Sequence, residues 1–195
     1  MNYTIDVPVN FNTRKQLDFL KKVSGSNDDA EILCYAVSIA AESLTINNEH
    51  GLPTRILNKC SDGFSEFHIP SDAFTVAGIV AAMAAMPEDK QGSVARLAVA
   101  PSLKQRLEYL KQSTGLKEDT QAVAFALQLT YALTDYMQQC KGKAFICFTN
   151  DLNRPGFKLS TMFDKTLKAR FGRATRKVRN KLRGILPKRQ AAPKQ

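Results

Sequence analysis

The chain has 195 residues and a formal net charge of +10, with 28 Lys and Arg against 18 Asp and Glu. Because 44% of the residues are hydrophobic and 24% are charged, the chain can bury a core, which excludes a disordered protein. The charge is uneven: residues 164–195 carry 12 Lys and Arg and one acid, so the first 163 residues sum to −1. This distribution excludes a uniformly basic surface and assigns the basic character to the C-terminal segment.

The N-terminal sequence lacks the basic and apolar regions of a secretory signal peptide. The longest apolar run, residues 73–86, would extend about 21 Å as a helix, short of the roughly 30 Å core of a membrane. The cysteines form no CxxC pair: they are Cys34, Cys60, Cys140 and Cys147. We therefore expect a soluble cytoplasmic protein with reduced thiols, no bound metal and no membrane association.

A strand is predicted close to the N-terminus. Ile5, Val7 and Val9 alternate with less apolar residues, and a period of two buries one face of a strand while the other stays exposed. Pro8 cannot donate a hydrogen bond to a neighbouring strand, so it belongs at the end or the edge of the sheet.

Two helices are predicted next. A short amphipathic helix carries Leu17, Leu20 and Val23 on its apolar face and ends at Gly25, because glycine readily adopts the positive φ of a helix end. A longer helix begins near Asn27, a candidate N-cap, and has acids in its first turn that suit the helix dipole. Its apolar surface is wider than one stripe, so it must be buried on several sides.

A hairpin and a third helix follow. Residues 53–59 and 64–70 have the pattern of two strands joined by a turn at Asp62-Gly63. An Ala-rich helix then runs to Met86, and residues 87–93 form a break in the pattern.

The same pattern recurs 90 residues later. From about Ile5 to Leu44, position n matches position n + 90 without a gap, with identities at Val9/Val99, Leu17/Leu107, Leu20/Leu110, Lys21/Lys111, Gly25/Gly115, Asp29/Asp119 and Ala36/Ala126. Residues 143–162 repeat the hairpin, with Pro155-Gly156 near its turn. One unit of about 40 residues cannot bury its apolar surface alone, and a single strand has no partner. We therefore expect strands 3–9 and 94–99 to pair, so that the chain is a dimer within one polypeptide.

This pattern resembles the ribbon-helix-helix (MetJ/Arc-type) superfamily of DNA-binding proteins. Residues 99–127 are similar to its strand end, first helix, glycine turn and second helix, and residues 9–37 follow the same plan. Tandem single-chain forms, such as the TraY-like and AcaB-like proteins of conjugative plasmids, are similar in plan. The resemblance implies an α+β, mainly helical fold, a tandem ribbon-helix-helix pseudo-dimer with appended β-hairpins and a basic C-terminal helix.

On this basis we expect five segments along the chain. Residues 1–48 and 93–140 form the two ribbon-helix-helix repeats, and residues 49–92 form a hairpin with an Ala-rich linker helix. Residues 141–163 form the second hairpin, and residues 164–195 form the basic helix and tail.

The resemblance also implies where DNA would bind. In that family an antiparallel ribbon enters the major groove, and the second helix offers its N-terminus to phosphates. Carried over by position, the base contacts are Thr4, Asp6 and Arg96, of which Arg96 can donate as a fork to guanine O6 and N7. For Asp6, plain solvation is an equal alternative to a contact with cytosine N4. Asn27 and Lys117, at the starts of the second helices, are the expected phosphate contacts.

The basic C-terminal segment is expected to supply further phosphate contacts. Acids at the second-helix starts, namely Asp28, Asp29, Glu118 and Asp119, would repel phosphates, so the ribbon alone would bind DNA weakly. A C-terminal helix can dock its apolar face on the body and lay its basic face along the phosphates. The cations of that face are Lys168, Arg170, Arg173, Arg176, Lys177, Arg179, Lys181 and Arg183. The alternatives are a disordered solubilising arm and a membrane-surface helix, but the absence of Trp and the narrow apolar face favour nucleic acid over a membrane.

No Ser/His/Asp or Cys/His set, phosphate-binding glycine loop or metal-ligand spacing is visible in the sequence. We therefore expect no enzyme and no cofactor. The first hypothesis is a sequence-specific, double-stranded DNA-binding transcriptional regulator of a bacterial plasmid or mobile element, such as of conjugation genes, with further copies of itself on adjacent sites as a second partner. The alternatives are a relaxosome-type architectural protein at an origin of transfer, and a protein- or RNA-interaction module with a degenerate ribbon.

Overall fold

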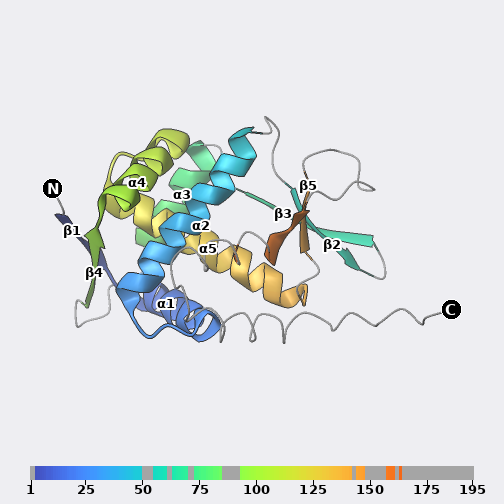
Figure 1. Ribbon diagram of the computed structural model, residues 1–195, viewed down its shortest axis with the longest axis horizontal. Coiled ribbons are helices and arrows are strands. Elements are labelled where there is room, and N and C mark those ends of the chain that lie inside the picture. The colour runs from blue at the N-terminus through green and yellow to red at the C-terminus, as the bar shows by residue number, and fades with distance from the viewer. Residues whose placement is uncertain are drawn as a thin grey trace.

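The fold is α+β and mainly helical, with two antiparallel sheets (Figure 1). One sheet is a ribbon of two strands and the other has four strands, and Figure 1 shows them at opposite ends with helices between them. The computed structural model describes residues 3–49, 55–60, 63–69, 73–84, 93–141, 144–147, 157–160 and 163.

The two halves of the chain repeat one order of elements. The first half contains β1 (Tyr3–Pro8), α1 (Phe11–Ser24), α2 (Asp29–Glu49), β2 (Arg55–Cys60), β3 (Gly63–His68) and α3 (Ala73–Ala84). The second half contains β4 (Val94–Val99), α4 (Pro101–Thr114), α5 (Asp119–Gln139), β5 (Ala144–Cys147) and β6 (Phe157–Lys158).

The ribbon confirms the predicted pairing of the two N-terminal strands of the repeats. β1 runs antiparallel to β4, from Tyr3 opposite Val99 to Pro8 opposite Val94. Ile5 and the other inward side chains are buried, apart from the half-buried Tyr3, and the alternate positions are exposed, as a period of two requires. Pro8 is the last residue of its strand, where its missing N–H leaves the ladder intact.

Glycine ends both short helices, as predicted. Gly25 and Gly115 have φ values of 80° and 74°, which side chains with a Cβ rarely adopt. Their backbone N–H groups donate to the carbonyls of Lys21 and Lys111 at 2.8 and 2.9 Å. This closed end turns the chain sharply into the long helix of each repeat.

The start of α2 differs from the prediction by one residue. The carbonyl of Asp28 accepts from the N–H of Ile32 at 3.2 Å, and its Oδ1 accepts from the N–H of Ala30 at 2.9 Å. Asp28 is therefore the residue that caps the helix, and the prediction of Asn27 as N-cap is wrong. Asn27 lies one position too early for its side chain to reach those amide groups.

The second sheet joins the hairpins of both repeats, which the sequence did not predict. Its strand order is β3-β2-β5-β6, with β2 antiparallel to β5 at the centre. The first hairpin pairs as predicted, but Gly63 lies opposite Cys60 as the first residue of β3 rather than within the turn. The second hairpin pairs β5 with β6, and Pro155-Gly156 lies outside the described residues.

The 90-residue offset of the sequence is a two-fold relation in space. Asp6 lies opposite Arg96 in the ribbon, and Ile56 lies opposite Ile146 in the four-stranded sheet. The two members of each pair are 90 residues apart, so each pair consists of equivalent positions that face each other. Equivalent residues of an antiparallel pair meet only on a two-fold axis, so one local axis runs through both sheets.

The hairpins keep the same offset. Arg55 lies opposite His68 in the first hairpin, and Phe145 lies opposite Lys158 in the second. Both residues of the second pair are shifted by 90 from those of the first. The sequence match is visible only from about Ile5 to Leu44, but the 90-residue relation continues in the structure through both hairpins.

The helices interlock across this axis. The guanidinium of Arg106 in α4 donates to Ser38 Oγ in α2 at 2.7 Å, and Gln16 in α1 hydrogen-bonds Gln128 in α5. These two contacts are equivalent, since each lies 90 residues from the other at both ends. Thr130 adds a buried bond between the long helices, from its hydroxyl to the carbonyl of Ala36 at 3.1 Å. The long helices bury several sides, as predicted, including Ile32, Leu33, Ile39, Val123, Phe125, Leu127 and Leu133.

Within the described residues, none of the helices has the length and apolar character needed to cross a membrane. The same part of the chain brings together no group of three His, Cys, Asp or Glu side chains that could hold a metal ion.

Leu17 and Leu107 are fully buried at equivalent positions of α1 and α4. We expect Leu17→Ala and Leu107→Ala each to lower the free energy of unfolding by about 2–5 kcal/mol, because each change leaves a cavity in the shared core. Urea unfolding followed by circular dichroism measures this. The control is Phe11→Ala, since Phe11 is large and apolar but 67% exposed, and should shift stability by about 0.5 kcal/mol or less. Losses as small as the control's would contradict the packing.

Candidate nucleic-acid interface

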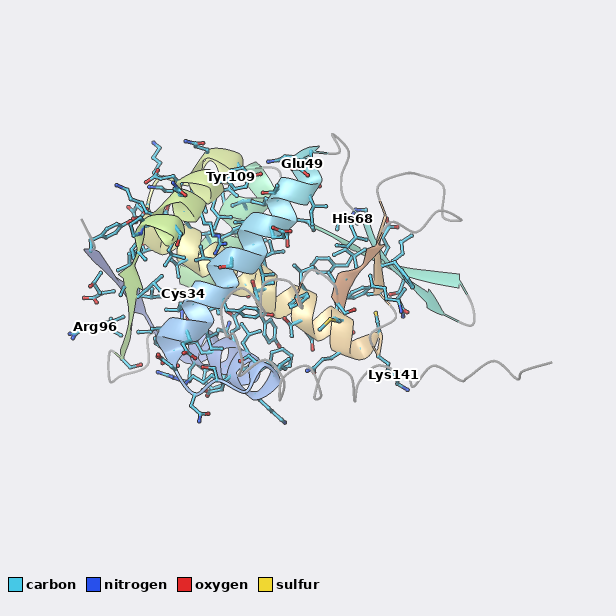
Figure 2. The ribbon with its side chains drawn as sticks, in the orientation of Figure 1. Cys34, Glu49, His68, Arg96, Tyr109 and Lys141 are labelled. Carbon is cyan, nitrogen blue, oxygen red and sulfur yellow. The ribbon has the colours of Figure 1, made fainter. Side chains whose placement is uncertain are left out.

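The outer face of the ribbon presents six exposed side chains, three from each repeat. They are Thr4, Asp6, Pro8, Val94, Arg96 and Ala98. The structure therefore brings the three predicted base contacts onto one face. Figure 2 shows Arg96 reaching away from the body of the protein. Whether these side chains contact bases stays a prediction.

Asp6 and Arg96 form an ion pair at the centre of this face. Arg96 Nε lies 3.6 Å from Asp6 Oδ1, and the two side chains are 80% and 65% exposed. An ion pair this exposed contributes only about 0–1 kcal/mol to stability, because water screens it. Both side chains can therefore exchange their mutual contact for contacts with a ligand at little loss. The sequence placed both residues outward, but only the register between the strands shows that they are partners.

The two ends of the ribbon differ in polarity. At one end Thr4 lies opposite Ala98, and at the other Pro8 lies opposite Val94. Val94 is 50% exposed, and Phe11, three residues after Pro8, is 67% exposed. One end of the face thus offers a hydroxyl and the other offers apolar groups.

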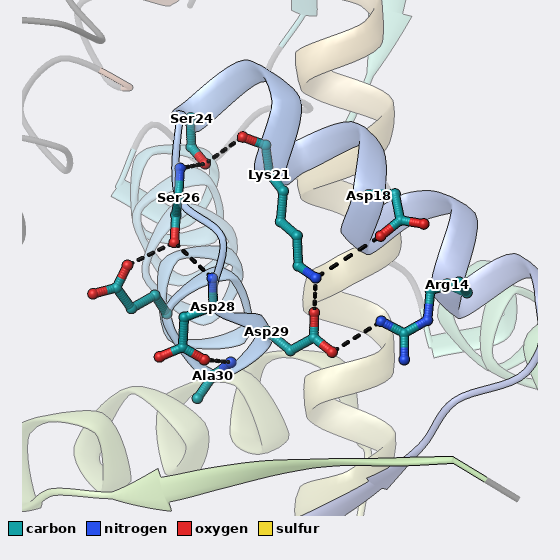
Figure 3. A network of polar contacts seen from close by, with 9 residues as sticks. Arg14, Asp18, Lys21, Ser24, Ser26, Asp28, Asp29 and Ala30 are labelled. Atoms are coloured by element: carbon teal, nitrogen blue, oxygen red, sulfur yellow. Dashed lines mark hydrogen bonds and ion pairs between the residues drawn. The ribbon is translucent and has the colours of Figure 1, made fainter.

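The acid at the start of α2 is neutralised from within its own repeat (Figure 3). Arg14 Nη1 donates to Asp29 Oδ2 at 3.0 Å, and Lys21 forms an ion pair with the same carboxylate. Lys21 also lies 3.8 Å from Asp18. This network connects the short helix to the start of the long helix across the glycine turn.

The second repeat contains the equivalent pair. Lys111 Nζ lies 2.8 Å from Asp119 Oδ1 and 3.1 Å from Glu108. Tyr3 of the other repeat donates its hydroxyl to Asp119 Oδ2 at 2.5 Å. Cations of the protein thus already hold the carboxylates of Asp29 and Asp119, which reduces the net negative charge at the two helix starts; the repulsion of phosphates stays a prediction.

The pKa values reflect these contacts. Burial alone raises the pKa of Asp29, but the hydrogen bonds and charges of Lys21 and Arg14 outweigh it and hold the pKa below its usual value. The pKa of Asp119 is lowered in the same way, with burial opposed by Lys111 and Tyr3. Burial, together with the hydrogen bond to Asp119, raises the pKa of Tyr3 to about 12, so this hydroxyl remains a donor.

A signal for these two ion pairs was present in the sequence. Lys21/Lys111 and Asp29/Asp119 are among the few identities between the repeats, eight residues apart across the glycine that ends the short helix. These identities indicate the repeat, but the sequence pattern does not pair the lysine with the aspartate. Only the sharp turn at the glycine shows that the two charges meet.

The predicted phosphate contacts Asn27 and Lys117 are both exposed just before the long helices. At the start of α2, the N–H of Asp28 donates to Ser26 Oγ at 3.2 Å, so side chains of the loop already occupy amide groups there. At the start of α5, Glu118 is the cap residue, and no side chain of the described part of the chain caps the helix. The two helix starts therefore differ in how many amide groups they present.

The eight predicted phosphate contacts from Lys168 to Arg183 lie outside the described residues. The last described residue, Phe163, packs against Tyr35 with the ring centroids 6.4 Å apart. Tyr35 lies in the second turn of α2, at the end of that helix nearer the ribbon (Figure 1).

Comparison with protein-family models, curated proteins and solved structures finds no match for this chain.

The lowered pKa values of Asp29 and Asp119 predict an acid-sensitive stability. In the folded protein both carboxyls release their protons at lower pH than in the unfolded chain, so their contribution is present above about pH 4 and is lost as the pH falls through the folded-state pKa. We expect Asp29→Asn and Asp119→Asn each to lower the free energy of unfolding at pH 7 by about 1 kcal/mol. In each variant the free energy of unfolding should also change less with pH below about pH 4 than it does in the parent. Urea unfolding from pH 7 to pH 3 measures both effects.

The matched control is Asp28→Asn, because Asp28 is exposed and asparagine caps a helix as well as aspartate does. Its stability should stay within about 0.5 kcal/mol of the parent at each pH. An Asp29→Asn variant with the parent's stability at pH 7 would contradict the ion-pair network.

Proposed function

We propose that this chain is a tandem ribbon-helix-helix protein that binds double-stranded DNA sequence-specifically and regulates transcription in a bacterial plasmid or mobile element. The observation that carries the proposal is the exposed antiparallel ribbon, made from strands about 90 residues apart, with Arg96 at its centre. A two-stranded ribbon has the dimensions that the major groove admits.

Base contacts would come from the polar side chains of the outer face. Arg96 can donate two parallel hydrogen bonds to guanine O6 and N7, which is the commonest specific contact to DNA. Thr4 can donate or accept, and Asp6 can accept from cytosine N4. The apolar residues Val94 and Ala98 can contact thymine methyl groups.

Phosphate contacts would come from the flanks of the ribbon and from the C-terminal segment. Lys117 and Asn27 stand at the helix starts, and two of the four nearby acids are already bound to cations of the protein. The first 163 residues carry a net charge of −1, so most of the attraction to DNA must come from residues 164–195.

Two other functions remain as second candidates. A protein- or RNA-interaction module is favoured by the weak polarity of the outer face, where Asp6 and Arg96 cancel in charge and Pro8, Val94 and Ala98 cannot hydrogen-bond through their side chains. An architectural protein at an origin of transfer would use the same ribbon. Measured bending of a bound DNA fragment separates that role from simple regulation.

We expect Arg96→Ala to lower the discrimination between specific and unrelated DNA by about 1–3 kcal/mol, because a bidentate base contact is lost. Gel shifts with fragments of the source genome measure this. The matched control is Lys158→Ala, which removes an exposed cation from the four-stranded sheet at the other end of the protein. Unchanged site preference in Arg96→Ala would rule out Arg96 as a base contact.

Removal of residues 164–195 should weaken binding to all DNA sequences alike, because phosphate contacts carry no sequence information. If six cations of this segment neutralise phosphates, the logarithm of the binding constant should fall with the logarithm of salt concentration at a slope of about −5 for the full chain. Titration with salt gives the slope, and the shortened chain should lose most of it. Equal slopes for the two proteins would contradict a role of the segment in DNA binding.

A further inference from the structure

We propose that Asp6 and Arg96 act together on one base pair at the centre of the DNA site, a G·C pair in a single orientation, so that the protein binds DNA in one direction. This inference rests on the proposed function and adds to it the polarity of the site. It follows from the position of the two residues on the local two-fold axis and from their opposite charges.

Position 6 is special because it faces its own equivalent. Across the ribbon, Thr4 lies opposite Ala98 and Pro8 lies opposite Val94, and neither pair consists of equivalent residues. In a ribbon built from two identical chains, the residue on the axis would meet a copy of itself, and the two copies would present the same chemistry to both DNA strands. A single chain removes that constraint, and here the axis position holds Asp6 in one repeat and Arg96 in the other.

The two side chains are complementary to one orientation of a G·C pair. In the major groove guanine presents two acceptors, O6 and N7, and cytosine presents the donor N4–H. Arginine has only donors and an ionised aspartate has only acceptors. Arg96 therefore matches guanine while Asp6 matches cytosine. The reversed base pair would set donors against a donor and acceptors against acceptors, and a thymine in place of cytosine would offer Asp6 an acceptor and a methyl group.

The geometry of the ion pair allows this shared contact. Arg96 Nε and Asp6 Oδ1 are 3.6 Å apart, so the two side chains lie close enough together to contact the two bases of one pair. Nη1 and Nη2 form the fork of the guanidinium that would donate to guanine O6 and N7. Both side chains are mostly exposed, so they lose little on turning to a base pair.

The two ends of the ribbon differ in chemistry, so they also distinguish the two orientations of the DNA site. The end with Thr4 can hydrogen-bond a base edge, whereas the end with Pro8 and Val94 can only make apolar contacts such as those with thymine methyl groups. The sequences on the two sides of the central base pair should therefore differ. Because the flanks differ, they set the orientation of the bound DNA, and the two orientations of the central base pair can then be compared.

The test is selection of bound DNA from a random pool, followed by sequencing, with the full chain and with the double variant Asp6→Arg, Arg96→Asp. We expect the parent to enrich a non-palindromic site with G·C at its centre, and the swapped variant to enrich C·G there with the flanks unchanged. In direct binding, the parent should prefer its own centre over the inverted one by about fivefold or more, and the swapped variant should show the opposite preference.

The swapped variant retains the ion pair and the net charge, so a merely structural role of the pair predicts no change in the central base pair. That result, or a palindromic site for the parent, would overturn the inference while the proposed function stands. No enriched sequence for either protein would contradict DNA recognition itself and the inference with it.

A second variant, Asp6→Asn, tests the inference even if the double variant does not fold. In Asp6→Asn the side chain keeps its shape but gains a donor, so it no longer rejects the wrong base opposite Arg96. We expect the preference for G·C over other pairs at the centre to fall at least about threefold, with the flanking preference retained and the urea unfolding curve near that of the parent. An undiminished central preference would overturn the part assigned to Asp6.

Discussion

β1 and β4 pair as an antiparallel ribbon, and this pairing brings the two repeats together. A lone strand leaves a row of backbone donors and acceptors without partners, and each repeat contributes only one strand to the ribbon. The strands must therefore meet, although 90 residues separate them in the chain. Once they pair with Asp6 opposite Arg96, the equivalent helices and strands that the structure describes follow the same two-fold relation.

The same axis explains the architecture behind the ribbon. The long helices α2 and α5 pack on each other, and each short helix reaches the long helix of the other repeat through Arg106 to Ser38 and Gln16 to Gln128. At the far end Ile56 and Ile146 meet on the axis, which joins two hairpins into one sheet. Neither repeat buries its apolar surface alone, so the core belongs to both.

Fusion of the repeats has a chemical consequence at the proposed interface. Positions that would be identical in a dimer of equal chains can differ here, and the outer face has lost its symmetry at every position. Behind the ribbon, the two repeats have the same stabilising ion pair, Lys21 with Asp29 in the first and Lys111 with Asp119 in the second. Stabilising charges lie at the helix starts, and the charges proposed to contact bases lie exposed at the centre of the ribbon.

The helices and strands can be predicted from the sequence, because period-two alternation, a helical apolar face and a terminal glycine are local signals. It therefore predicted the pairing of the ribbon strands, the outward positions of Thr4, Asp6 and Arg96, and the glycine ends of the short helices. It missed the cap by Asp28, which depends on one residue of helix register. Three features come from the folded chain alone: Asp6 lies opposite Arg96, lysines neutralise Asp29 and Asp119, and the two hairpins form one sheet. Those contacts join residues distant in the chain, and strand register and turn geometry set them rather than the pattern of any one segment.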